Sequence, residues 1–228
     1  REKGLGKAAK KADRLASEGL VSVVVSDDNK TATITEINSE TDFVAKNATF
    51  VDLVKNTTLH VQTNSITTVD ELKESSIGGV KFEEFFQSQI ATIGENLVVR
   101  RFETIKASQN GVVAGYIHSN SRVGVLIGAA CDSEETASKI GDFLRNLCMH
   151  AAAMNPLYVK SSQVPTEVLE REKDVMREQL LNEGKPADRI EGILVGKVNK
   201  YYSEICFCFV KLVKISFNCS AKTEYFQK

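Results

Sequence analysis

Residues 38–47 read NSETDFVAKN and mark the corner at which a strand gives way to a helix. The residues just before this stretch, TATITEI, are rich in β-branched side chains and favour a strand. From the corner onward, apolar residues recur at helical intervals, at Phe43, Val44, Phe50, Val51 and Val54. We therefore expect a helix that runs to about residue 57 and packs on a sheet, with its first turn pointing away from that sheet.

The first turn of this predicted helix has a recognisable capping pattern. Ser39 is followed three residues later by Asp42, which predicts a capping box in which both side chains satisfy free N–H groups. Phe43 has two interpretations at this position. An aromatic residue in a first turn is usually part of the core, whereas the exposed start of the helix would leave it available to a partner.

Composition and charge argue against several classes of protein, among them disulfide-rich, zinc-binding and membrane-spanning proteins. The 228 residues suffice for one or two domains with a real core. Since 29 basic and 30 acidic residues nearly cancel, no global field attracts nucleic acid. The five cysteines form an odd set without a C-x-x-C pair, which favours reduced thiols over a disulfide framework or a zinc site. No apolar run approaches the roughly 20 residues that span a bilayer, and the first residues are charged rather than signal-like.

Two β-hairpins are predicted. The first joins residues 20–25 and 31–37 through the polar turn SDDNK, and the second joins residues 111–117 and 122–130 through a turn that contains His118. Between them, residues 82–93 have the spacing of a helix that ends at Gly94, and residues 98–102 favour a strand. Residues 58–77 are polar and are interpreted as a connecting loop, in which Asp70-Glu71-Leu72 favours a short helical start. The repeated hairpins predict an α+β fold with two similar halves.

The second half of the chain is predicted to be mainly helical. A helix is expected over about residues 134–154, with His150 as a packing residue. Two further helices are expected over residues 166–181 and 187–202, joined by Asn182-Glu183-Gly184-Lys185-Pro186, which predicts an antiparallel helical hairpin. Its apolar face includes Val168, Leu169, Met176, Leu180, Ile190, Ile193, Leu194 and Val198.

No enzyme motif emerges from the sequence. It has no phosphate-binding loop and no nucleophile elbow, and its acidic residues lack the spacing of metal ligands. We therefore expect a protein that works by binding rather than as an enzyme, without a cofactor or a resident metal.

Several blocks resemble one family. NSETDFVAKN is similar to the Thr-Asp-Phe-Val signature of elongation factor Ts, the guanine-nucleotide exchange factor for elongation factor Tu. The block IGENLVVRR at residues 93–101, the block CMHAAA at residues 148–153 and the segment from Gly196 to Cys206 resemble the same family. The resemblance implies a translation factor that binds elongation factor Tu and promotes release of its GDP by disturbing the Mg²⁺ and phosphate site.

The resemblance also implies which residues contact the partner. Phe43 would insert into an apolar gap beside the partner's Mg²⁺ site, with Asp42 and the adjacent backbone holding it in place. The helical hairpin of residues 166–202 would correspond to a protruding coiled coil that self-associates in some members, which makes a homodimer an expectation. The implied partner-binding residues are Thr41, Asp42, Phe43, Val44, Ile93, Gly94 and His118.

The resemblance suggests a domain division and also has limits. We expect a linker-helix remnant at 1–18, a core N-subdomain at 19–102, a core C-subdomain at 103–165 plus 203–228, and the helical hairpin at 166–202. The first segment resembles the linker that follows an N-terminal helical domain, so a truncated chain is expected. The run at residues 207–217 departs from the family and favours a strand that completes the second sheet.

Two alternatives stay open. Lys7, Lys10, Lys11 and Arg14 give the first segment a basic face, so a non-catalytic RNA-binding module is the main rival to an exchange factor. The bacterial cytoplasm is the expected location, with an organelle matrix or stroma as the alternative.

Overall fold

The computed structural model describes residues 6, 10–118, 120–207 and 221–227 of the chain. It combines helices with antiparallel sheets, which confirms the predicted α+β class. The chain divides into two compact units, one made of Arg1–Ala152 with Phe217–Lys228 and the other of Ala153–Ser216. Each unit is described below by itself.

The first sheet of the larger unit has the strand order β1 (Glu18–Val25), β2 (Thr31–Ser39) and β5 (Val98–Lys106), and all its pairings are antiparallel. The first hairpin is thus confirmed. Its turn is built by Asp28, whose Oδ1 accepts hydrogen bonds from the Ser26 hydroxyl at 2.5 Å and from the Lys30 N–H at 3.0 Å. A bulge between Glu36 and Ile37 shifts the register of β2 against β5.

Helices cover one face of this sheet. They are α2 (Asp42–Ala45), α3 (Ala48–Thr63), α4 (Val69–Glu74) and α5 (Phe82–Ile93), and a short β3 (Ser76–Ile77) and β4 (Val80–Lys81) pair lies between the last two. The bounds of α5 and the left-handed Gly94 after it, with φ of 92°, match the prediction. Within residues 58–77, α4 confirms the expected short helical start at residues 70–72, but the segment is not a loop overall, because it also includes the end of α3.

The single helix predicted from the corner is two helices. Asn47 interrupts it, since its side chain accepts a hydrogen bond from the Thr49 N–H at 2.8 Å and caps a new helix. Phe50 and Val54 are buried as predicted, but Val51 is 40% exposed. The break between α2 and α3 changes the angular position of later residues, which is why the predicted apolar face was partly wrong.

The second sheet has the order β6 (Gly111–Ile117), β7 (Val123–Ala130) and β8 (Ala221–Gln227). The second hairpin is therefore confirmed. The strand that completes this sheet is β8, and all of the predicted 207–217 strand except Phe207 lies outside the described residues.

The predicted helix over 134–154 is divided into α6 (Glu134–Lys139) and α7 (Gly141–Met154). His150 on α7 is exposed, so it is not a packing residue, whereas Cys148 and Ala151 are buried.

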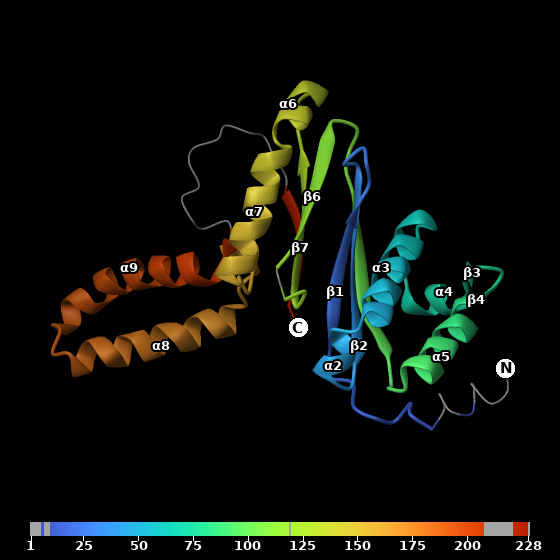
Figure 1. The fold of residues 1–228 in the computed structure, drawn as a ribbon. Helices are drawn as coiled ribbons and strands as arrows, with labels where there is room; N and C mark the ends of the chain where they lie inside the picture. The colour runs from blue at the N-terminus through green and yellow to red at the C-terminus, as the bar shows by residue number, and fades with distance from the viewer. Residues whose placement is uncertain (1–5, 7–9, 119, 208–220, 228) are drawn as a thin grey trace. The chain divides into compact units, whose positions relative to one another are not determined.

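The two sheets stack face to face. Figure 1 shows layers in the order α7, second sheet, first sheet, and α3 with α5. Val21, Ile34, Val113 and Leu126 form part of the core between the sheets. Gly124 permits the close approach, because a Cβ added there would lie 2.6 Å from Val21 Cγ1 and 2.9 Å from Ile34 Cδ1.

The smaller unit contains a short 3₁₀ turn, η1 (Ser161–Gln163), and two long helices, α8 (Thr166–Asn182) and α9 (Ala187–Ile205). The two helices lie side by side and run in opposite directions (Figure 1). Met176 and Leu180 on α8 and Ile190 and Leu194 on α9 are buried. Val168 and Ile193, which the pattern placed on the apolar face, are 37% and 36% exposed, because two helices bury only a narrow stripe.

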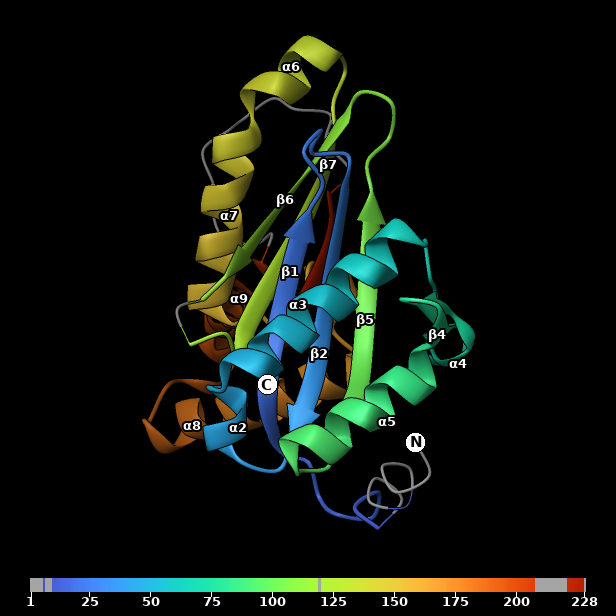
Figure 2. The same cartoon turned by 45° about the vertical axis from the view of Figure 1, so that its right-hand side comes forward.

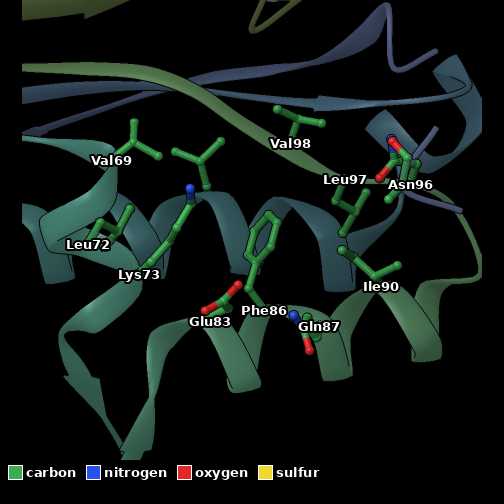
Figure 3. Close-up of a pocket in the computed structure, with 12 residues that line it drawn as sticks. Val69, Leu72, Lys73, Glu83, Phe86, Gln87, Ile90, Asn96, Leu97 and Val98 are labelled. Atoms are coloured by element: carbon green, nitrogen blue, oxygen red, sulfur yellow. The ribbon is translucent and has the colours of Figure 1, made fainter. Parts of the chain in front are cut away.

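A cavity of about 610 Å³ opens between α4, α5 and the start of β5. Figure 3 shows Phe86, Ile90 and Leu97 around it, together with the polar side chains of Lys73 and Glu83. None of the partner-binding residues implied by the family resemblance lines this cavity.

Candidate functional site

The corner between β2 and α2 is capped differently from the prediction. Ser39 still belongs to β2 and pairs with Glu18, so the N-cap lies two residues later than predicted. Thr41 is the N-cap, and its Oγ1 accepts a hydrogen bond from the Val44 N–H at 3.4 Å. Asp42 does not cap the helix; its Oδ2 instead accepts a hydrogen bond from Lys46 Nζ at 2.7 Å. The predicted capping box was wrong because strand pairing extends through Ser39.

Phe43 is the exposed residue of this short helix. Its side chain is 80% exposed, whereas Val44 packs partly against the core and Ala45 is buried. The interpretation of Phe43 as a core residue is therefore wrong. Phe43 is thus a large aromatic side chain held out in solvent, in a turn whose next two residues are packed.

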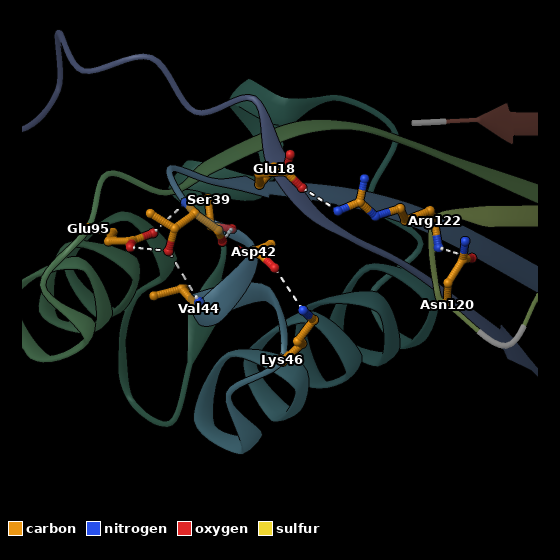
Figure 4. Close-up of polar contacts among 9 residues, drawn as sticks. Glu18, Ser39, Asp42, Val44, Lys46, Glu95, Asn120 and Arg122 are labelled. Atoms are coloured by element: carbon orange, nitrogen blue, oxygen red, sulfur yellow. Dashed lines mark hydrogen bonds and ion pairs between the residues drawn. The ribbon is translucent and has the colours of Figure 1, made fainter.

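The block that follows α5 is bonded to this corner. Glu95 Oε2 accepts hydrogen bonds from the N–H groups of Glu40 and Thr41, both at 3.0 Å, and Glu95 Oε1 accepts one from Thr41 Oγ1 at 2.6 Å. Figure 4 shows the dashed lines that join the Glu95 carboxylate to this corner. Ile93 packs partly against the core and Gly94 is exposed. The structure therefore joins the predicted Thr41–Val44 and Ile93–Gly94 segments.

The turn between β6 and β7 carries His118. The His118 ring is exposed, and its Nδ1 lies 3.3 Å from the Tyr116 hydroxyl. Arg122 Nη2 donates to Glu18 Oε2 at 2.6 Å, and Glu18 in turn pairs with Ser39 at the end of β2. Figure 2 shows α2, the end of α5 and this turn at the same end of the stacked sheets. All three predicted segments thus border one surface.

Local charges act on Asp42. The hydrogen bond from Lys46 lowers the pKa of the Asp42 carboxyl below its ordinary value, and the more distant Arg122 guanidinium lowers it further. The carboxylate is therefore ionised at neutral pH. Around Phe43 the surface thus consists of an aromatic side chain and exposed charged groups.

Sequence reasoning quoted Glu40 and Glu95 within the two motifs and gave neither a role. Their only signal was an acidic residue inside each motif, and their role as hydrogen-bond acceptors becomes visible only when the fold brings the two segments together. Among the residues that the structure describes, no group of three or more His, Cys, Asp or Glu side chains is placed to hold a metal ion. Within the same residues, no helix is long and apolar enough to cross a membrane.

The basic segment at the start of the chain is only partly described. Residues 10–13 form a turn rather than the predicted helix, with the Arg14 N–H donating to the Lys11 carbonyl at 2.9 Å. Arg14 Nη1 lies 3.7 Å from Glu40 Oε2. One of the four basic groups proposed to contact RNA is thus beside a carboxylate of the same chain, which reduces its attraction for phosphate.

Comparison with known proteins identifies the family. The model of the family "Elongation factor TS" matches residues 40–215. The chain is 77% identical to elongation factor Ts from Campylobacter fetus subsp. fetus (strain 82-40) over 84% of its own length and 54% of that protein's length. It is 51% identical to elongation factor Ts from Campylobacter curvus (strain 525.92), over 90% of this chain and 70% of that protein. The chain thus spans about half the length of the first of these relatives, and it belongs to the elongation factor Ts family.

Proposed function

We propose that this chain binds elongation factor Tu and promotes release of its GDP through the surface formed by Thr41, Asp42, Phe43, Val44, Ile93, Gly94 and His118. The observation that carries the proposal is the 80% exposure of Phe43 on a turn that is fixed on both sides. Family membership supports elongation factor Tu as the partner. The chain acts as a nucleotide exchange factor rather than as an enzyme with catalytic residues of its own.

The proposed mechanism is a reciprocal coupling of two binding equilibria. A GTPase holds GDP through backbone amides of its phosphate-binding loop and a phosphate-bound Mg²⁺, so a factor that displaces these groups weakens nucleotide binding. Phe43 inserts beside the Mg²⁺ site and stabilises the nucleotide-free GTPase, which is then free to bind GTP. By linkage, the factor binds the empty GTPase more tightly by the same factor by which it loosens the nucleotide.

The magnitudes require more than one contact. A ten-thousandfold shift needs about 5.5 kcal/mol of differential affinity. Burial of one phenylalanine supplies about 2–3 kcal/mol. The contacts of Ile93, Gly94 and His118 must supply most of the remainder, which agrees with their position on the same surface.

The test is the rate at which labelled GDP leaves elongation factor Tu. Phe43→Ala should slow the stimulated release roughly 30- to 150-fold, since the lost burial is about 2–3 kcal/mol. Leu59→Ala is the matched control, because Leu59 is also exposed, at 49%, but lies in the last two turns of α3. Equal rates for wild type and Phe43→Ala, at saturating factor, would exclude this role for Phe43.

The finer organisation of the chain is part of the same proposal. We assign a linker remnant to 1–18, two similar halves to 19–102 and to 103–165 plus 203–228, and a coiled-coil hairpin to 166–202.

Exposed apolar side chains on α8 and α9 support self-association through this hairpin; they are Val168, Val175, Leu181, Ile193 and Val195. A monomer by sedimentation velocity at micromolar concentration would argue against the homodimer. The bacterial origin of the relatives supports a bacterial cytoplasm as the location.

A further inference from the structure

Glu95 is bonded to the turn that presents Phe43. Its carboxylate accepts three hydrogen bonds, from the Glu40 N–H, the Thr41 N–H and the Thr41 hydroxyl, at 3.0, 3.0 and 2.6 Å. These are charge-assisted bonds to groups that precede the first turn of α2. Glu95 therefore fixes the backbone of Glu40 and Thr41, which leads into the turn that presents Phe43.

The connection is reciprocal. Glu40 Oε1 accepts a hydrogen bond from the Asn96 N–H at 2.6 Å, so each segment supplies one carboxylate to the backbone of the other. Asn96 is 4% exposed, and its Nδ2 donates to the Arg14 carbonyl at 2.7 Å and to the Ala12 carbonyl at 3.3 Å. Four hydrogen bonds thus join two segments that lie more than 50 residues apart in the chain.

The turn needs this support because α2 is short. It has four residues and is followed by a break, and so short a helix is not stable by itself. Packing of Val44 and Ala45 holds one side of the turn. The Glu95 carboxylate holds its beginning, and together these two anchors determine the direction in which Phe43 points.

We propose that Glu95 is a positioning residue for nucleotide exchange: its carboxylate holds the start of α2 so that Phe43 is presented to the GTPase in a fixed direction. The Gly94 segment and the Phe43 turn then act as one rigid unit. This inference rests on the proposed function, and it assigns to Glu95 no contact with the partner or the nucleotide.

The first experiment measures stimulated GDP release from elongation factor Tu with Glu95 variants. Glu95→Ala should lower the rate at subsaturating factor about tenfold, through loss of three hydrogen bonds that are partly exposed. Glu95→Gln should stay within about threefold of wild type, because its amide oxygen can still accept both N–H groups. Glu84→Ala is the control, since Glu84 is an exposed glutamate on α5, and its rate should equal that of wild type.

A double-mutant cycle separates positioning from a general effect on the fold. If Glu95 acts through Phe43, Glu95→Ala should cost less than about twofold once Phe43 is already alanine. A full tenfold loss in the Phe43→Ala background would overturn the inference, because a residue that only stabilises the protein would weaken both backgrounds equally.

Amide hydrogen exchange provides a test that does not depend on the GTPase. In Glu95→Ala the N–H groups of Glu40 and Thr41 should exchange at least about tenfold faster, while those in the middle of β2 should remain unchanged. Unchanged protection of Glu40 and Thr41 would overturn the inference. If the Phe43→Ala variant stimulates GDP release from elongation factor Tu as fast as wild type does, the proposed function fails. If the Phe43→Ala variant stimulates release slowly and the Glu95→Ala variant stimulates it at the wild-type rate, only the positioning role of Glu95 fails.

Discussion

The α2 corner and the β6–β7 turn border the same surface but are fixed by different means. At the corner, side chains far apart in the sequence supply the anchors, with Glu95 accepting three hydrogen bonds from Glu40 and Thr41. At the turn, a backbone hydrogen bond from the Val21 N–H to the Ser121 carbonyl at 2.8 Å supplies one anchor. The exposed Arg122–Glu18 ion pair supplies the other.

This difference indicates a division of roles within the surface. An exposed ion pair contributes at most about 1 kcal/mol, so the position of His118 depends mainly on the packing of its hairpin against the first sheet. The turn that carries Phe43 is held by the hydrogen bonds to Glu95, so a partner that bound there would order little and the entropy lost on binding would be small. We expect Phe43 to determine affinity and His118 to adjust to the partner.

Among changes that leave Phe43 and Glu95 in place, the largest effect should come from disturbing the packing of the second hairpin on the first sheet. Gly124→Ala should lower the free energy of unfolding by about 1–3 kcal/mol, because the new methyl group would lie against Val21 and Ile34 between the sheets. Urea denaturation followed by circular dichroism measures this. Gly141→Ala is the control, since an added Cβ there meets nothing within 4 Å, and it should not destabilise the protein. Equal stability of the Gly124→Ala variant would show that the sheets are not closely packed at this point.

A smaller effect is expected from the cap of the corner. Thr41→Val removes both the acceptor of the Val44 N–H and the donor to Glu95, and loss of such a cap costs about 1 kcal/mol. Stimulated GDP release should fall about fivefold at subsaturating factor. Thr41→Ser keeps the hydroxyl and should restore most of the rate; a serine variant as slow as the valine variant would contradict the role of the hydroxyl.

His118→Ala should have a still smaller effect. Because the His118 ring is exposed and lies at the edge of the surface, stimulated release should fall about two- to threefold. Stopped-flow measurements of stimulated GDP release with the His118→Ala and Phe43→Ala variants compare the two regions directly. A loss for His118→Ala as large as that for Phe43→Ala would reverse the proposed ranking.

The last prediction concerns the charge beside Phe43. The hydrogen bond from Lys46 lowers the pKa of Asp42 in the folded protein. This pair therefore stabilises the fold above the unfolded pKa of about 3.9, and the contribution is lost as the pH falls through the folded pKa. Titration of the Asp42 carboxyl by carbon NMR should show a pKa that rises toward its ordinary value in Lys46→Met. An unchanged pKa in that variant would exclude Lys46 as the main cause.

Much of the architecture could be predicted from local patterns. Both hairpins and α5, with Gly94 directly after its last residue, match the prediction, because alternation, turn residues and a C-cap glycine act over a few residues. The predicted helix after the corner failed at Asn47, whose capping ability was visible but competed with an unbroken apolar pattern. The predicted capping by Ser39 failed because pairing with Glu18 keeps Ser39 in the strand.

By itself the sequence determined the family, the α+β class and the segments that carry Phe43, Gly94 and His118, because motifs and periodicity are properties of short stretches of chain. Only the tertiary structure decided that Phe43 is exposed, that Glu95 and Glu40 join the two segments, and that the β6–β7 turn borders the same surface. The last two facts depend on hydrogen bonds between residues more than 50 positions apart, and no short stretch of sequence carries a pattern for such bonds.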